Sequence, residues 1–459
     1  MEKRTAKYDS IIIGFGKGGK TLAADLAAKN EKIAIIERSD RMYGGTCINV
    51  GCIPTKSLVN SSHMAKIKDL GSFEEKAKFF KEAMAEKERV VTMLRAKNYE
   101  KLANHPNVTV FNGEGSFLCD HQIRVEYADG SEEILVGDKI FINTGSAAFV
   151  PNIEGLAGSK HTYTSEGLLE LTELPRHLII LGGGYISLEF ASYYMSFGSK
   201  VTLLQKGEEF IPKEDREIQA QVLKILEDKG MTLITQATPV LVADKGDGVE
   251  VTVDVASKKE KIEGDAFLVA TGRRPNVKKL NLENADVELT DRGGVKVNER
   301  MQTSRSHIYA MGDVVGGLQF TYKSLDDYRI VKSALEGGDY VDVGRNLAYS
   351  VFMDPPLSRI GLTADEAEAK GYKNIVEVSL PAAAIPKAHV LRHPVGLLKA
   401  VINMDDKTVL GATLLCEESY EMINIVKTVM DNNLTYTVLR DQIFTHPTMS
   451  EALNDLFNV

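Results

Sequence analysis

The sequence predicts an α/β protein with two Rossmann-like dinucleotide-binding domains and a C-terminal α+β domain. A strand, a glycine-rich turn, a helix and a second strand follow one another near the N-terminus, and the same order returns after residue 176. Strand-like runs before a helical end then fill the last hundred residues. The length of 459 residues suits this arrangement, since it allows about three domains of about 150 residues each.

The first copy begins with a short apolar run at 9–13, which indicates a buried strand. Gly14, Gly16 and Gly19 then form a G-x-G-x-x-G pattern, whose glycines let amides at a helix start approach a pyrophosphate. Glu37 ends the next strand, where an acid accepts from a ribose hydroxyl. The segment 14–21 also fits the P-loop pattern. That nucleotide-hydrolase interpretation explains neither the second copy nor the cysteine pair described below.

The second copy has its strand at 177–181 and its turn at Gly182 and Gly184. The next strand ends at Gln205, and the offset from the first glycine is the same in both copies. The expected acid is absent, because Gln205 and Lys206 stand there. An acid would hold a bare ribose and repel a 2′-phosphate, so this site favours NADPH or use of both nicotinamides. The alternative is that Lys206 is only a solvated surface lysine.

Composition and charge exclude several classes of protein. Lys and Arg number 55 against 64 Asp and Glu, which leaves a net charge of −9 and disfavours nucleic acid as a partner. The apolar runs are short, so we expect no membrane span, and no export signal precedes the first glycine turn. We therefore expect a cytoplasmic protein.

The most specific motif is GGTCINVGCIPTK at 44–56. In an ideal helix the Cα atoms of Cys47 and Cys52 would be roughly 8–9 Å apart, whereas a disulfide needs about 4.4–6.8 Å. A bonded pair therefore requires a distorted backbone, which Gly51 would ease. Such a disulfide is easily reduced and suits turnover. The alternatives are two buried free cysteines or a metal site, for which a second ligand pair is missing nearby. Cys119 and Cys416 are isolated, and we expect inert core residues.

Near the C-terminus, His446 and Glu451 lie five positions apart across Pro447. A carboxylate beside an imidazole fixes its tautomer and gives a general acid/base. The spacing alone is a weak signal. Between the motifs, we expect a long helix at 74–102, and strand-to-glycine turns at 140–145 and 267–272 where the chain crosses between domains.

Together these motifs resemble the flavoprotein disulfide reductases, the family of glutathione reductase, lipoamide dehydrogenase and mercuric reductase. The resemblance implies domains at 1–150 with 273–345 (FAD), 151–272 (NAD(P)H) and 346–459 (dimerisation). It implies a homodimer in which His446 and Glu451 reach the other subunit's disulfide, with Cys52 facing the flavin and Cys47 outward. The FAD residues it implies are Gly14, Gly16, Gly19, Glu37, Gly45, Thr46, Lys56, Gly115, Thr144, Gly145, Gly312 and Asp313. For NADPH, with NADH possible, they are Gly182, Gly184, Tyr185, Ile186, Glu189, Gln205, Lys206 and Gly272.

Within the family, the segments AMGDVVGGLQFTYKSLDDYRIV, YSVFMDPPLSRIGLT and DQIFTHPTMSEALNDLF look similar to the reactive-chlorine-resistance branch of RclA type. That branch implies reduction of a small oxidant, hypothiocyanous acid, to thiocyanate. The alternatives are reduction of copper(II) or mercury(II) and, less favoured, a lipoamide or glutathione type of disulfide reduction. The chain has no cysteine pair after Glu451, as a mercuric reductase would need, and we expect no resident metal.

Overall fold

The computed structural model describes residues 4–459, and these divide into two units. Unit 1 contains residues 4–58, 82–149 and 272–344, and unit 2 contains residues 59–81, 150–271 and 345–459. Each unit is described by itself below. The mixed α/β fold agrees with the fold class that the sequence predicts.

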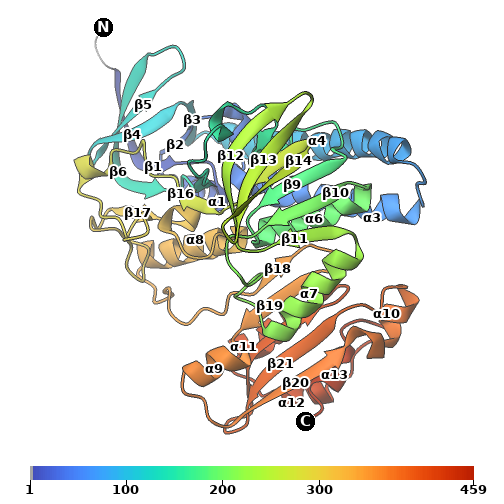
Figure 1. The fold of residues 1–459 in the computed structure, drawn as a ribbon. Coiled ribbons are helices and arrows are strands. Elements are labelled where there is room, and N and C mark those ends of the chain that lie inside the picture. Colours follow the sequence, from blue (N-terminus) through green and yellow to red (C-terminus); the bar gives the residue numbers. More distant parts are fainter. Residues whose placement is uncertain (1–3) are drawn as a thin grey trace. The chain divides into compact units, whose positions relative to one another are not determined.

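Unit 1 is built on a sheet in which the central strand β1 pairs in parallel with β2 and β6 (Figure 1). The strand order is β3-β2-β1-β6-β5-β4, and β17 pairs with β6. The bounds are β1 Arg4–Ile13, β2 Ile33–Glu37, β3 Val108–Asn112, β4 Glu114–Cys119, β5 Gln122–Glu126, β6 Glu132–Ile142 and β17 Ile308–Ala310. A two-stranded ribbon joins β7 (Ser146–Ala148) to β16 (Arg273–Pro275).

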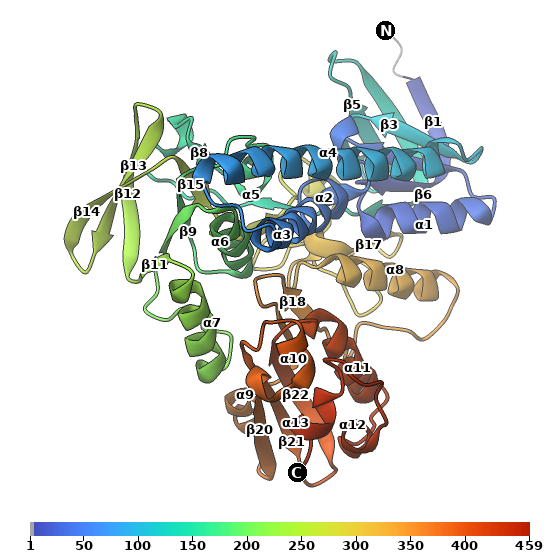
Figure 2. The same cartoon turned by 90° about the vertical axis from the view of Figure 1, so that its right-hand side faces the viewer.

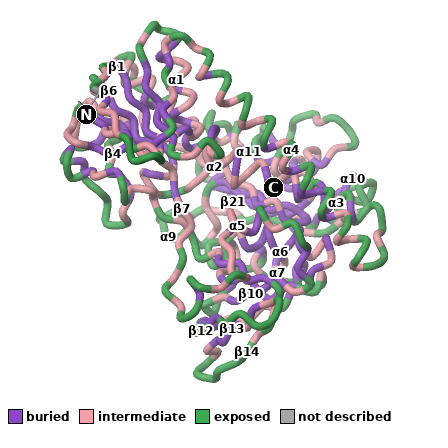
Figure 3. The backbone as a smooth tube through the Cα atoms, turned by 90° about the horizontal axis from the view of Figure 1, so that it is seen from above, coloured by how far each residue is buried: buried purple, intermediate pink, exposed green. Residues whose placement is uncertain are grey.

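The apolar run of β1 serves both faces of this sheet, which explains why it does not alternate with polar residues. Ile11 and Ile13 belong to one buried cluster, whereas Ile12 belongs to another that includes Leu22 of α1 (Lys17–Ala28) and Ile330 of α8 (Thr321–Leu335). Successive side chains of a strand point to opposite faces, so a strand covered on both sides is apolar throughout. The last three residues of β1 and of β6 are buried, and Figure 3 shows buried segments beside both labels.

The helices of unit 1 follow the expected order. They are α1 Lys17–Ala28, α2 Gly45–Asn49, α3 from Cys52, α4 up to Ala103 and α8 Thr321–Leu335. Helices α3 (Cys52–Ile67) and α4 (Phe73–Ala103) continue from one unit into the other. The long helix expected at 74–102 is thus α4, which Figure 2 shows as one continuous rod.

Unit 2 contains a parallel sheet with the order β11-β10-β9-β15-β8. Its central strand β9 is followed by helix α6, as β1 is followed by α1. The bounds are β8 Thr162–Tyr163, β9 His177–Leu181, α5 Ser165–Leu168, α6 Tyr185–Phe197, β10 Lys200–Leu204, α7 Arg216–Asp228, β11 Met231–Ile234 and β15 Ala266–Val269. The antiparallel strands β12 (Ala237–Lys245), β13 (Gly248–Val255) and β14 (Lys258–Gly264) form a separate sheet that the sequence analysis did not predict (Figure 2).

The C-terminal part of unit 2 is α+β, as expected, with an antiparallel sheet in the order β18-β19-β22-β21-β20. The bounds are β18 Tyr349–Val351, β19 Leu357–Gly361, α9 Ala364–Ala369, β20 Ile375–Pro381, α10 Pro386–Val390, β21 Leu397–Asn403, β22 Thr408–Leu415, α11 Ser419–Asp431, α12 Thr437–Asp441 and α13 Ala452–Leu456. The buried carboxylate of Asp354 binds the ammonium groups of Lys66 and Lys229 at 2.9 and 2.7 Å. It therefore anchors the loop before β19.

Candidate active site

The first glycine turn lies at the carboxyl end of β1, where open α/β sheets bind their ligands. Gly14 has φ of +103°, and a Cβ there would lie 2.3 Å from the carbonyl oxygen of Asn143, so only glycine fits. Glu37 accepts the N–H of Phe15 at 3.1 Å, and its burial raises the pKa of this carboxyl. Glu37, at the end of β2, therefore holds the first glycine turn in place through a buried hydrogen bond.

The second glycine turn repeats this construction in unit 2. Gly182 has φ of +105°, and its Cβ would lie 2.7 Å from the carbonyl oxygen of Ala270. Gln205 accepts the N–H of Gly183 at 2.9 Å, in the way that Glu37 accepts that of Phe15. In both turns the side chain at the end of the second strand accepts the N–H of the residue after the first glycine, which supports an internal duplication. The carboxylate of the first copy is replaced by a neutral amide in the second. Lys206 is exposed beside it.

The turns also leave room for a bound dinucleotide. Gly184 caps the N-terminus of α6, and a Cβ added there would meet nothing within 4 Å. Gly272, predicted for the same ligand, is likewise open, but it belongs to unit 1. In unit 1, a Cβ on Gly145 would touch only the hydroxyl of Thr46, at 4.0 Å. Open backbone beside a helix start is what a pyrophosphate or nucleotide needs, so the residues fit FAD in one unit and a nicotinamide in the other.

The cysteine pair lies where helix α2 breaks and α3 begins. Cys47 is in α2, which ends at Asn49, and Cys52 is the first residue of α3. The interruption brings the two thiols close enough for Cys52 to raise the pKa of Cys47, although they are not joined in the structure. The distortion that the spacing required is therefore present. Gly51 allows it by close packing rather than by a left-handed conformation, because its Cβ would lie 3.0 Å from the carbonyl oxygen of Thr46.

The short helix that carries Cys47 is fixed from two sides. Asn49 donates to the carbonyl oxygens of Tyr43 and Gly45 at 3.1 and 2.9 Å, and Arg95 donates to Asn49 at 2.8 Å. A Cβ on Gly45 would lie 2.7 Å from the Cα of Gly16, so α2 packs its backbone directly against the first glycine turn. The redox motif and the predicted FAD turn are thus adjacent.

Two further residues act on the cysteine pair, Thr321 through a contact with Cys52 and Lys20 through its charge, and neither was predicted from the sequence. The hydroxyl of Thr321, at the start of α8, lies 3.5 Å from the sulfur of Cys52. The hydrogen bond with Cys52 and burial raise the pKa of the Cys47 thiol, whereas Thr321 lowers it. Burial, aided by Lys17, lowers the pKa of Lys20 to about 8, and a thiolate on Cys47 acts against this shift. Lys20 also donates to Asn98.

The other residues predicted for FAD occupy unit 1. Asp313 accepts the hydroxyl of Ser146 at 2.9 Å, and its burial raises the pKa of this carboxyl. Thr144 donates to the carbonyl oxygen of Asn276 at 2.9 Å. Gly312 donates its N–H to Asp327 at 2.9 Å, and Lys56 donates to Thr55 at 3.3 Å. Gly115 lies within β4, and Gly19 donates to the side chain of Asn143 at 2.9 Å.

The remaining residues predicted for the nicotinamide begin helix α6. Tyr185 and Ile186 are its first two residues, and Glu189 accepts the N–H of Phe352 at 2.9 Å. The resemblance to the family also implies that Lys56 and Glu189 form a pair beside the flavin ring, but the two belong to different units. Their pairing therefore stays a prediction.

His446 and Glu451 lie together in unit 2. The Nδ1 atom of His446 is 2.8 Å from a carboxylate oxygen of Glu451, so the carboxylate fixes the tautomer with the proton on Nδ1 and leaves Nε2 free to exchange one. The His446 side chain is 72% exposed, whereas that of Glu451 is 19% exposed. A histidine held in this way and turned to the surface can act on a group outside its own unit.

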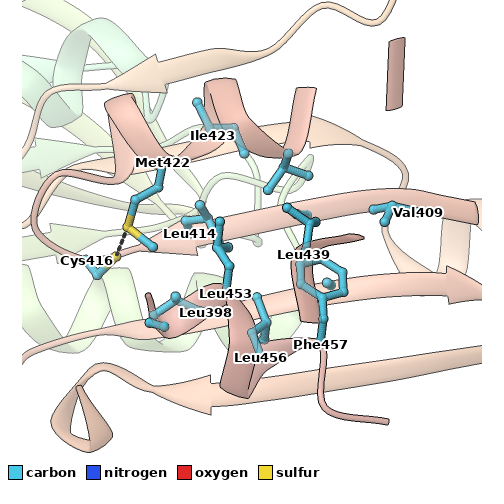
Figure 4. Close-up of a cluster of buried hydrophobic side chains, with 14 of the residues drawn as sticks. Leu398, Val409, Leu414, Cys416, Met422, Ile423, Leu439, Leu453, Leu456 and Phe457 are labelled. Carbon is cyan, nitrogen blue, oxygen red and sulfur yellow. Dashed lines mark hydrogen bonds between the residues drawn. The ribbon is translucent and has the colours of Figure 1, made fainter. Parts of the chain in front are cut away.

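The two isolated cysteines differ in burial. Cys416 is fully buried, and its thiol donates to the sulfur of Met422 at 3.9 Å within the apolar cluster of the C-terminal sheet (Figure 4). Cys119 is only partly buried at the end of β4, so the expectation of a core residue is wrong for it. Cys119 lies at the turn to β5, where the strand meets solvent.

Comparison with known proteins identifies the family. The sequence pattern of the pyridine nucleotide-disulphide oxidoreductases matches residues 8–327, and that of their dimerisation domain matches residues 347–457. The chain belongs to this family of oxidoreductases.

The similarity to individual relatives covers almost the whole chain. It is 48% identical to the probable pyridine nucleotide-disulfide oxidoreductase RclA of Escherichia coli K12, over 99% of both chains. A mercuric reductase of Bacillus cereus is 34% identical over 97% of this chain and 70% of its own length. A solved Cu(II) complex of the HOCl-induced flavoprotein disulfide reductase RclA from E. coli matches with a TM-score of 0.92 at 47% identity, over 98% of this chain and 99% of that one. Among the described helices, none is long and apolar enough to cross a membrane.

Proposed function

We propose that this protein is an FAD-dependent NAD(P)H oxidoreductase that reduces hypothiocyanous acid to thiocyanate through Cys47 and Cys52. The observation that carries the proposal is that the two cysteines flank a helix break whose first helix packs directly against the first glycine turn, with Cys52 near enough to raise the pKa of Cys47. The RclA relative supports the substrate class, because it is described as an HOCl-induced flavoprotein disulfide reductase.

The bound flavin would supply the electron pair that keeps the two cysteines reduced. Cys47, the outward thiol by family resemblance, attacks the sulfur of hypothiocyanous acid as a thiolate and displaces hydroxide. A new S–S bond then joins Cys47 to the thiocyanate group. His446 of the partner subunit gives the departing hydroxide a proton, so that water leaves.

The second step uses the contact between the two thiols. Cys52, as a thiolate, attacks the sulfur of Cys47 and releases thiocyanate, which closes the Cys47–Cys52 disulfide. The dithiol has then lost two electrons and two protons. One proton has gone to the departing hydroxide and the other to solvent, and the oxidant has become thiocyanate and water. Thr321 can donate to the sulfur of Cys52 while it carries charge, because its hydroxyl lies 3.5 Å away. The partner's His446 makes a homodimer necessary, which the dimerisation domain supports.

The decisive experiment follows NADPH consumption with hypothiocyanous acid by the purified holoenzyme. Cys47→Ser should abolish the oxidant-dependent rate, and Cys119→Ser is the matched control that should keep it. Full activity of Cys47→Ser would contradict the route. A protein that purifies without bound flavin would contradict the whole proposal.

The nicotinamide preference follows from the second turn. A neutral Gln205 with the exposed Lys206 removes the repulsion that an acid exerts on a 2′-phosphate, so NADPH is used at least as well as NADH. Lys206→Ala should raise the KM for NADPH several-fold and leave the KM for NADH unchanged. An equal change for both nicotinamides would contradict a role of Lys206 at the 2′-phosphate.

Reduction of copper(II) is the second candidate. The relative of known structure was solved as a Cu(II) complex, and two adjacent thiols are good ligands for a soft metal ion. A comparison of turnover on hypothiocyanous acid, copper(II) and mercury(II) at matched concentrations separates the candidates. The preferred substrate should give the larger kcat/KM by at least tenfold.

A further inference from the structure

Three side chains that can bind a metal ion come together in unit 1. Asp120 and His121 form the turn between β4 and β5, and His307 stands directly before β17. One ligand atom from each of the three lies within 4.8 Å of the others. His307 is 187 positions from Asp120 in the chain, so no local motif joins them, and the sequence analysis did not expect a metal site.

The main chain holds both histidines against the same strand. The N–H of Gly137, in β6, donates to the carbonyl oxygen of His121 at 3.0 Å. The N–H of Ile140, also in β6, donates to the carbonyl oxygen of His307 at 3.0 Å. The two imidazole rings stack, with their centroids 4.0 Å apart and their planes 9° from parallel. Strand β6 therefore brings the two histidines together as a pair.

Each imidazole ring also has one nitrogen bonded to a backbone carbonyl. The Nδ1 atom of His121 lies 2.8 Å from the carbonyl oxygen of Gly137, and the Nε2 atom of His307 lies 2.9 Å from that of Asp120. A carbonyl oxygen can only accept, so in the neutral rings these two nitrogens carry the proton. The lone pairs are left on Nε2 of His121 and on Nδ1 of His307. Metal-binding histidines are held in this way, with the other ring nitrogen donating to a carbonyl or a carboxylate.

The three side chains offer the ligands that a zinc-type ion prefers. Two imidazole nitrogens and one carboxylate oxygen leave the fourth position to water, which reaches the group because His121 is exposed. A ring lone pair lies in the ring plane, so two stacked rings cannot both point at one ion. The ring of His121 has room to tilt, whereas that of His307 is half-buried. Two ligand atoms of a tetrahedral zinc ion are about 3.3 Å apart, so a small tilt is enough.

We propose that Asp120, His121 and His307 form a surface binding site for a divalent transition-metal ion of the zinc type. The site lies at the other end of β17 from the predicted FAD residues, because His307 precedes this strand, whereas Gly312 and Asp313 follow it. The bound ion links the turn between β4 and β5 to the start of β17. It therefore stabilises unit 1 by joining two segments that are distant in the chain.

A second group of this kind is less suited to a cation. Asp354, His393 and Glu417 also place one ligand atom each within 4.8 Å of the others. However, the carboxylate of Asp354 already binds the ammonium groups of Lys66 and Lys229, whose charges repel a metal ion. The group in unit 1 has only one charged member, the carboxylate of Asp120, and this charge attracts a cation.

The test is calorimetric titration with Zn²⁺ of the flavin-loaded, tag-free enzyme in which Cys47 and Cys52 are both replaced by Ser, so that these thiols do not bind the ion. The titration is repeated after a third substitution in the metal-binding group. Asp120→Asn, His121→Gln and His307→Gln should each weaken the binding of Zn²⁺ at least about tenfold. Asp120→Asn keeps the size of the side chain, so it separates the loss of a ligand from a change in the turn.

Thermal unfolding gives a second measurement. An ion that binds only the folded chain stabilises it, so Zn²⁺ should raise the Tm of the Cys47→Ser, Cys52→Ser protein by several degrees. This rise should be absent in Asp120→Asn and His307→Gln. The matched control is His105→Gln, which replaces a partly buried histidine of unit 1 that belongs to neither group and should keep both the affinity and the rise in Tm.

Other outcomes overturn the metal site. If Zn²⁺ does not bind the Cys47→Ser, Cys52→Ser protein, or binds it and the three further variants equally, these side chains form no site. An equal loss in His105→Gln traces the effect to the protein as a whole. A loss in His393→Gln alone places the ion in the second group. The inference does not need the proposed reduction of hypothiocyanous acid, so each can fail without the other.

Discussion

Thr321→Ala removes the hydroxyl that lies 3.5 Å from the sulfur of Cys52. This hydroxyl also lowers the pKa of Cys47 in the same dithiol, so its loss should raise the apparent pKa of the pair. A hydrogen bond of this kind contributes about 1 kcal/mol, which corresponds to a rise of about 0.7 in pKa. Below that pKa the thiolate fraction, and with it the rate of alkylation, should fall about fivefold.

The assay is the pH dependence of iodoacetamide alkylation of the reduced enzyme, followed by mass spectrometry of the cysteine peptides. Thr321→Ser is the matched control, because it keeps a hydroxyl at the same position and should retain the native profile. A profile of Thr321→Ala that overlays the native one would refute the reasoning. So would an equal displacement in Thr321→Ser, since that would trace the effect to packing rather than to the hydrogen bond.

Three further predictions concern the ion pairs of Asp354, the retention of flavin in a Gly45 variant and the titration of Lys20. Asp354→Asn should lower the free energy of unfolding by about 2–4 kcal/mol, because it leaves two lysines without their buried partner. Burial opposes ionisation, but the lysines hold the pKa of Asp354 well below its usual range, so thermal denaturation should show this gap above about pH 4 and its loss at lower pH. Gly45→Ala should release bound flavin, measured by absorbance, and destabilise the enzyme by about 1–3 kcal/mol. Gly130→Ala is the control, because Gly130 also has a positive φ but a Cβ there would meet no other atom within 4 Å, and this variant should keep its flavin. The pKa of Lys20 is lowered to about 8, so this lysine loses its proton as pH rises through 8, and the free energy of unfolding should increase from there towards pH 10.5. Lys20→Met should remove that increase and any inflection near pH 8 in the alkylation rate of Cys47. An inflection that remains in Lys20→Met would contradict the assignment.

Local patterns in the sequence were enough to predict the two nucleotide folds. A buried strand that ends in a glycine-rich turn is followed by a helix in this type of fold. The second copy was recognised because the number of residues from the first glycine to the end of the next strand is the same as in the first copy. The structure shows why the pattern is so restrictive: a Cβ on Gly14 or Gly182 would collide with the carbonyl oxygen of the residue that follows a neighbouring strand. The spacing of Cys47 and Cys52 also predicted a broken helix, because an intact one would hold the thiols apart.

Contacts between distant segments were beyond these patterns. Thr321 lies 269 positions from Cys52, and His307 lies 187 positions from Asp120, and neither carries a local motif. Strands β12 and β13 were missed because polar or exposed residues interrupt their buried positions, and β14 was missed because it is mostly charged and exposed. None of the three shows the apolar run that identified the buried strands. Cys119 was misjudged because a lone cysteine gives no sign of how near the surface its strand ends.

The closeness of α2 to the first glycine turn has a consequence for how the protein tolerates change. A single methyl group at Gly45 would collide with the backbone of Gly16 at 2.7 Å, so helix α2, which carries Cys47, packs too closely against the first glycine turn to accept a larger residue there. Mutational drift in either segment would have to be matched in the other. An engineering study that aims to change the orientation of the Cys47 thiol should therefore keep Gly16 and Gly45 and vary the residues that contact the cysteine pair from other strands and helices.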